Sequence, residues 1–156
     1  MWNVISTLAG VGIGSLVTYF LSKSLMRLQI EQQQKIKKDY SRKVLQAILE
    51  EIEIGINRCL TIVKFSEEGK GSYSRIYTSL WDSAKIIISE GIEDIEVLRL
   101  LHKIYHRFDL INFNMEKERL GPGAAFAREY GREITENYVS LKERIRGSEV
   151  DNYSSA

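Results

Sequence analysis

The first 22 residues of the chain contain no charged side chain. As an α-helix, the run from Trp2 to Leu21 spans about 30 Å, close to the thickness of the hydrocarbon core of a bilayer. A cleavable signal peptide has a basic start and a small-residue cleavage site, and this chain has neither. The alternative is a buried core helix, but the segment is apolar around its whole circumference. The sequence therefore predicts an uncleaved transmembrane anchor over residues 1–22.

The charges that follow this run predict its orientation. Residues 23–43 carry seven basic and two acidic side chains, whereas residues 44–156 carry fifteen basic and nineteen acidic ones. The positive-inside rule then places the N-terminus outside the inner (plasma) membrane and the C-terminal domain in the cytoplasm, as a single-pass protein. No nucleic-acid partner is expected, because the positive charge is not on the part that folds.

The basic block is also placed to contact anionic lipid headgroups, at about 1 kcal/mol for each residue near the surface. The alternative is that these side chains are only a solvated topology signal. The predicted anionic-lipid contacts are Lys23, Arg27, Lys35, Lys37 and Lys38.

Small residues recur at every fourth position inside the anchor: Ser6, Gly10, Gly14 and Thr18. This spacing places them on one face of a helix, and small faces let membrane helices approach closely. We therefore predict self-association of the chain through this face, as a dimer or a higher ring. The alternative is that glycine is simply frequent in membrane helices.

Residues 23–43 are polar and rich in glutamine. Leu21, Leu25 and Leu28 follow a four–three spacing, but the next heptad positions are Gln32 and Lys35. A heptad coiled coil would therefore lapse after a turn or two. We expect a basic helical stalk, continuous with the anchor and weakly self-associating at best.

From Leu45 onward, apolar residues recur at spacings of three and four, as in amphipathic helices. Four helices with short connections predict an all-α fold, an antiparallel four-helix bundle behind the anchor and stalk. The expected helices run from residue 45 to the loop at 66–72, then over 73–90, 95–120 and 122–147. The predicted domains are an anchor (1–22), a stalk (23–43), a cytosolic bundle (44–147) and a disordered tail (148–156).

Several residues predict details of these helices. Ser72 or Ser74 suits the N-cap of the second bundle helix, and Gly91 suits the left-handed position after its end. Asp94 suits the cap of the third helix. Gly55 predicts either a close contact with another helix or a slight bend. We expect Leu60 and Tyr77 to lie on the inward stripes.

Candidate catalytic residues are few. His102 and His106 have the spacing of a metal-binding pair, but "HKIYH" lacks the glutamate of the zinc-protease motif. We interpret the two histidines as residues at the edge of the buried stripe. Cys59 lies on an apolar stripe with nothing adjacent that would lower its pKa, so we interpret it as a core residue. No metal, cofactor or enzymatic activity is predicted.

One segment suits an anion or small ligand. "LGPGAA" (120–125) precedes Arg128 and Arg132, which places helix N–H groups near two guanidinium groups. A plain turn between helices followed by exposed arginines is the alternative.

The stretch "LWDSAKIIISEGIEDIEVLRLLHKIYHRFDLIN" (80–112) resembles a region of small prokaryotic proteins that pair one N-terminal membrane helix with a helical cytosolic domain. The shared residues are Trp81, Gly91, Leu101, Tyr105 and Asn112. With the anchor, the resemblance covers about a third of the chain. It implies a fold but no reaction. Some proteins of this type belong to phage-defence systems, including CRISPR-associated effectors that sense cyclic oligoadenylates.

These patterns predict a non-enzymatic, membrane-anchored homo-oligomer whose cytosolic bundle binds a protein partner or a small ligand. The alternative is a ligand-activated oligomeric membrane effector, or pore-forming protein, of a prokaryotic defence system. In that alternative a nucleotide is one candidate for the small ligand.

Overall fold

The computed structural model describes the backbone of residues 2–69, 75–117 and 122–154, and the side chains of residues 17–69, 75–116 and 124–147. The described residues form helices and no strand, which confirms the all-α prediction. The helices are α1 (Trp2–Glu67), α2 (Ser79–Gly91), α3 (Ile95–Lys117) and α4 (Pro122–Ser154). The chain divides into two compact units, Met1–Asp39 and Tyr40–Ala156.

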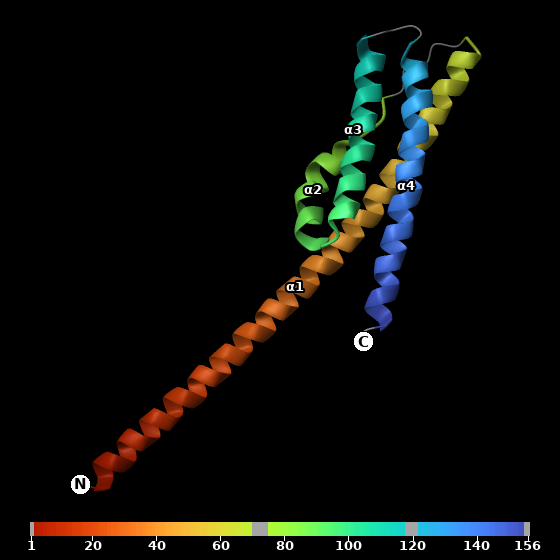
Figure 1. The fold of residues 1–156 in the computed structure, drawn as a ribbon. Helices are drawn as coiled ribbons and strands as arrows, with labels where there is room; N and C mark the ends of the chain where they lie inside the picture. The colour runs from red at the N-terminus through yellow and green to blue at the C-terminus, as the bar shows by residue number, and fades with distance from the viewer. Residues whose placement is uncertain (1, 70–74, 118–121, 155–156) are drawn as a thin grey trace. The chain divides into compact units, whose positions relative to one another are not determined.

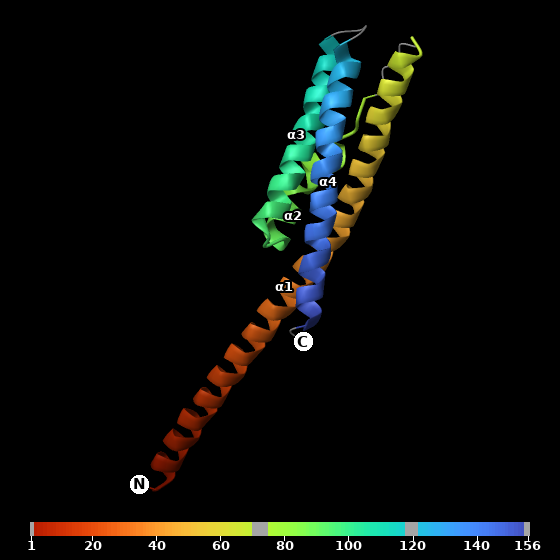
Figure 2. The same ribbon diagram turned by 45° about the vertical axis from the view of Figure 1, so that its right-hand side comes forward.

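In the second unit, successive helices run in alternating directions (Figures 1 and 2). Contacts between α3 and α4 give their register, because Asp94 lies beside Arg144 and Arg107 lies beside Glu133. The earlier of the two residues at α3, Asp94, thus meets the later of the two on α4, Arg144. The two helices are therefore antiparallel. The same reversal holds between the second half of α1 and α2, where the buried Ser41 hydroxyl donates a hydrogen bond to the Ile87 carbonyl.

All four helices contribute to one apolar core. Apolar residues at every third or fourth position bring their side chains to a single helix face, and these faces meet at the centre of the unit. The fully buried core side chains include Ile48 and Ile52 of α1, Ile88 of α2, Leu101, Ile104, Tyr105 and Phe108 of α3, and Ile134 and Leu141 of α4.

Gly55 lies in this core against α3. A Cβ atom at Gly55 would stand 2.5 Å from Cζ of Phe108, which is shorter than any real carbon contact. Glycine here therefore lets the ring of Phe108 reach the backbone of α1. Of the two interpretations of this residue, the close helix contact is confirmed.

The predicted start of the second bundle helix is wrong. α2 begins at Ser79, and residues 75–78 have no regular structure, so neither Ser72 nor Ser74 caps it. Ile76 is fully buried outside the helix, because its N–H donates to Oδ1 of Asn112 (2.9 Å) and its carbonyl accepts from Nδ2 of Asn112 (2.8 Å). The Asn112 amide thus replaces the hydrogen bonds that these two backbone groups would make within a helix.

The glycines near two helix ends also differ from the predictions. Gly91 is still helical, and α2 is followed by Ile92 in extended backbone. The only left-handed glycine in the described part of the chain is Gly69, just after α1. α4 continues through Gly147 to Ser154, past the point at which we expected it to end.

Two residues expected on inward stripes are exposed. Leu60 is 64% exposed, because the buried face of α1 passes through Cys59 and Ile62 and is narrower than the apolar pattern suggests. Tyr77 is 60% exposed and lies before α2 rather than within it. Its ring packs under the guanidinium group of Arg58, 4.3 Å from the ring centroid.

The first unit consists of the N-terminal part of α1. Every described side chain from Val17 to Tyr40 is exposed. Most of the predicted anchor over 1–22 concerns residues 1–16, whose side chains lie outside the described residues. Within the part of the chain that the structure describes, none of the helices combines the length and the apolar character required to cross a membrane.

Candidate functional site

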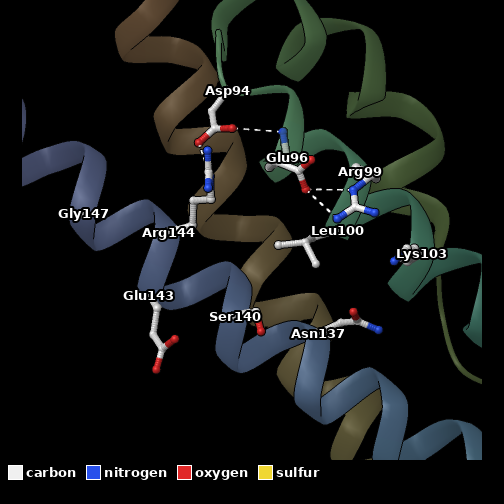
Figure 3. A pocket seen from close by; sticks show the side chains of 10 residues that line it. All are labelled: Asp94, Glu96, Arg99, Leu100, Lys103, Asn137, Ser140, Glu143, Arg144 and Gly147. Atoms are coloured by element: carbon white, nitrogen blue, oxygen red, sulfur yellow. Dashed lines mark hydrogen bonds and ion pairs between the residues drawn. The ribbon is translucent and has the colours of Figure 1, made fainter.

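A polar groove lies between α3 and α4 in the second unit, with a volume of about 820 Å³ (Figure 3). Side chains from both helices and from the turn before α3 line it. These are Asp94, Glu96, Arg99, Leu100 and Lys103 on one side, and Asn137, Ser140, Glu143, Arg144 and Gly147 on the other.

Asp94 joins the two walls of the groove. Its Oδ1 accepts a hydrogen bond from the Glu96 N–H (2.9 Å), as expected of the residue that caps α3. Its Oδ2 accepts a second bond from Nε of Arg144 on α4 (2.6 Å). The bond from the Arg144 guanidinium is the main reason that the pKa of the Asp94 carboxyl lies below its usual range, and the two backbone N–H groups of α3 add to this effect.

The remaining charges of the groove are less constrained. Glu96 and Arg99 form an ion pair on one turn of α3, with 2.8 Å between Oε2 and Nε. The exposed Lys103 and Glu143 have no ion-pair partner among the residues that the structure describes. Figure 3 shows them on opposite walls. The groove thus offers one free cation and one free carboxylate to a bound molecule.

The charged side chains of this groove are balanced in sign. The ten residues that line it include no histidine or cysteine, and its acidic and basic side chains are equal in number. The lowered pKa of the Asp94 carboxyl keeps this group ionised at neutral pH. The geometry suits a polar ligand that presents both signs of charge.

We expect Asp94→Ala to lower the free energy of unfolding by about 1 kcal/mol at neutral pH, because α3 loses its cap. The folded pKa of Asp94 is depressed, so its ionic contribution is present above the unfolded pKa of about 3.9 and is lost as the pH falls below it. The difference between wild type and variant should therefore shrink in urea titrations at acid pH. Asp94→Asn is the control, since an amide keeps the cap; a variant effect that does not change with pH would contradict the ionic part.

The two arginines predicted for anion binding each lie beside a carboxylate. Arg128 pairs with Glu67 at the end of α1. Arg132 is 3.7 Å from Glu136 on its own helix, between Nε and Oε1, and its side chain is 84% exposed. Each guanidinium therefore already faces a carboxylate. The turn at 118–121 that would complete the predicted anion site lies outside the described residues.

The predicted membrane and lipid contacts all lie on α1. Ser6, Gly10 and Gly14 are in the helix, but their side chains lie outside the described residues. Thr18 is described and exposed. The five predicted lipid contacts, Lys23, Arg27, Lys35, Lys37 and Lys38, are also exposed.

The histidines and the cysteine occupy ordinary structural positions. His102 is exposed and meets Trp81 edge to face, with ring centroids 5.1 Å apart. His106 is exposed one turn later on α3. Cys59 is buried in the core, and this burial raises the pKa of its thiol to about 12. This burial confirms its interpretation as a core residue. A thiol with that pKa is also hardly ionised at neutral pH.

The structure contains two tyrosine–glutamate pairs that the sequence did not predict. The Tyr105 hydroxyl donates to Oε2 of Glu51 (2.6 Å), while Oε1 of the same carboxylate accepts from the Leu80 N–H at the start of α2 (3.2 Å). The Tyr138 hydroxyl donates in the same way to Oε1 of Glu53 (2.6 Å). The sequence indicates only that inward tyrosines need polar partners; it does not say which ones.

Arg144, like most residues that line the groove, was not singled out by the sequence. It lies far along the chain from Asp94, and nothing in its local sequence distinguishes it from the other arginines of α4. Only the antiparallel register of α3 and α4 brings the two together.

Comparisons with known proteins found no relative: no family model matches the chain, and neither a curated protein nor a solved structure resembles it.

Proposed function

We propose that the chain is a non-enzymatic, single-pass membrane protein. In this proposal residues 1–22 cross the inner membrane, residues 23–43 form a basic stalk at its cytoplasmic surface, and the helical bundle binds a partner or small ligand in the cytoplasm. Copies of the protein associate through the face that carries Ser6, Gly10, Gly14 and Thr18.

The observation that carries the proposal is the order of features along one helix. α1 runs without interruption from Trp2 to Glu67. Along it, uncharged residues give way to basic residues at Lys23, and the buried face of the bundle begins at Ser41. A span-length uncharged segment followed by a basic flank is typical of an anchor with its C-terminal side in the cytoplasm.

A specific observation also favours the second candidate, a membrane effector that a ligand activates. The groove between α3 and α4 has the volume of a small-molecule site, and its polar walls suit a charged ligand. Ligand binding there would bear on the contact between Asp94 and Arg144, and so on the packing of the bundle. Ion leakage on overexpression, with and without added nucleotides, separates this effector from a passive scaffold.

The membrane proposal is tested by fractionation of cells that express the full chain. We expect the protein to stay with the membrane pellet after alkaline carbonate extraction, because an apolar helix that spans the bilayer is not released by loss of charge contacts. A version that begins at Lys23 should appear in the soluble fraction. Recovery of the full chain in the carbonate supernatant would refute the anchor.

The association proposal is tested in the same membranes with an amine-reactive crosslinker. We expect Gly10→Leu and Gly14→Leu to lower the crosslinked fraction severalfold, because a large side chain separates closely packed helices. Gly12→Leu is the matched control, since residue 12 lies on the opposite face of the helix. Equal loss from all three variants would count against the predicted face.

A further inference from the structure

In part of α1, large apolar side chains are exposed. From Val17 to Tyr40 every side chain is exposed, and many of these are large and apolar. An isolated helix in water is only marginally stable, and a continuous apolar patch on a protein usually marks an interface. We therefore expect another molecule to bind to this exposed face.

Six positions of this segment form one continuous row, which we name the seam. They follow a spacing of four, four, three, four and four residues: Val17, Leu21, Leu25, Leu28, Gln32 and Ile36. The five apolar members are each more than half exposed. At about 100° per residue the seam stays within an arc of about 100° on a straight helix. A heptad pattern ends at Lys35, but this eleven-residue pattern continues to Ile36.

The same pattern extends back into the predicted anchor. Counting back from Val17 by three and then four residues gives Gly14 and Gly10. An eleven-residue repeat corresponds to a straight or slightly right-handed pair of helices, and small-residue faces of membrane helices also cross with a right-handed angle. The small residues of the anchor and the seam therefore lie on one helix face, and both patterns favour a right-handed crossing of two helices.

A bilayer is poorly placed to cover the part of the seam that follows the proposed anchor, from Leu25 to Ile36. No proline or glycine occurs between Gly14 and Gly55, so nothing in the sequence of this stretch favours a kink. If residues 1–22 cross the membrane, the following residues leave it along the same axis and cannot lie flat on its surface. Gln32, in the middle of the seam, also suits a neighbouring helix better than acyl chains.

The basic charges of the stalk are compatible with a second copy of the chain, whereas Asp39, three residues after Ile36, falls on the line of the seam and ends it. Lys23, Arg27, Lys37 and Lys38 fall on the side of the helix away from the seam at 100° per residue. Lys35 flanks the seam on one side, and Gln29 and Gln33 flank it on the other. In a parallel pair, opposite flanks of the two helices meet, so Lys35 of one copy faces the glutamines of the other.

We propose that the seam binds a second copy of this chain in a parallel, near-straight helix pair, with Gln32 of one copy beside Gln32 of the other. The inference rests on the proposed membrane anchor, which makes the two copies parallel. It extends the contact between copies from the anchor into the stalk. The paired glutamines hydrogen-bond across the seam and set its register, as a single polar core residue does in other helix pairs.

The test is disulfide crosslinking of single-cysteine additions in the full chain within native membranes. Cys59 stays in place, because its buried thiol has a raised pKa and serves as the background. We expect Leu25→Cys, Leu28→Cys and Ile36→Cys to form covalent dimers on mild oxidation, since a parallel pair brings equivalent seam positions within disulfide distance. Met26→Cys and Ile30→Cys, on the opposite face, should stay at background.

Two results would overturn the proposal. One is equal crosslinking on both faces. The other is a membrane-bound protein in which cysteines in the seam neither crosslink nor react with a water-soluble maleimide, which would show that lipid covers the row. Failure of the anchor itself is distinct, since the protein would then leave the membrane fraction.

A charge placed in the seam gives an independent check of register. In the Leu28→Cys background, Gln32→Glu should reduce dimer formation by at least about tenfold, because two carboxylates would then face each other. Gln34→Glu, on the opposite face, is the matched control and should leave the dimer yield unchanged. An equal effect of both substitutions would overturn the proposed register.

Discussion

Asn112→Ala is expected to lower the free energy of unfolding by about 3 kcal/mol, because it leaves two buried backbone groups of Ile76 without partners. Asn112 is 6% exposed, so water does not readily replace the amide. The amide ties the segment before α2 to α3, and its loss should also speed hydrogen exchange in α2. Urea titration of the full chain in detergent micelles, followed by tryptophan fluorescence, measures the change.

Asn114→Ala is the matched control for this prediction. Nδ2 of Asn114 donates to the Leu110 carbonyl one turn earlier on the same helix, so its removal frees no group of another element. We expect this variant to lose less than about 1 kcal/mol. Equal losses from Asn112→Ala and Asn114→Ala would show that the link to Ile76 contributes nothing particular to stability.

Gly55→Ala is expected to lower the free energy of unfolding by about 1–2 kcal/mol, although alanine is the better helix former. The added methyl group would overlap the ring of Phe108, which is fully buried, so the ring or the backbone of α1 would have to shift. The expected figure is the cost of overpacking less the gain of about 1 kcal/mol in helix propensity. The same urea titration measures it.

Two further variants separate overlap from propensity. Gly147→Ala should raise stability by up to about 1 kcal/mol, because nothing lies within 4 Å of the added methyl group. Phe108→Leu should make the Gly55→Ala change less costly than it is in the wild type, since the smaller side chain leaves room. If the effects of Gly55→Ala and Phe108→Leu on the free energy of unfolding are additive, the added methyl group does not contact the ring of Phe108.

In α2 the buried positions match the periodic pattern, but the start of the helix does not. Ile76, Trp81, Ala84 and Ile88 are all buried as the periodic pattern indicated, yet the helix begins at Ser79 rather than Tyr73. The pattern reports which side chains face the core, and a short extended segment can bury Ile76 equally well. The choice between the two conformations depends on Asn112, which is distant in the sequence.

The candidate site was harder to predict than the fold. Asp94 was recognisable as a helix cap, because capping depends on a few neighbouring residues. Its ion pair with Arg144 was not, since that contact exists only when α3 and α4 lie antiparallel in one particular register. Arg128 and Arg132 each meet a carboxylate that the local sequence of the turn does not reveal, and the anion site predicted for them stays a prediction.

The sequence by itself determined the helical class, the identity of most core residues and the order of uncharged, basic and amphipathic segments, because each of these follows from short-range spacing. The tertiary structure alone decided where α2 begins, which glutamate each buried tyrosine meets and which charges line the groove. Those features depend on contacts between residues far apart in the chain, and only the packed register of the helices brings such residues together.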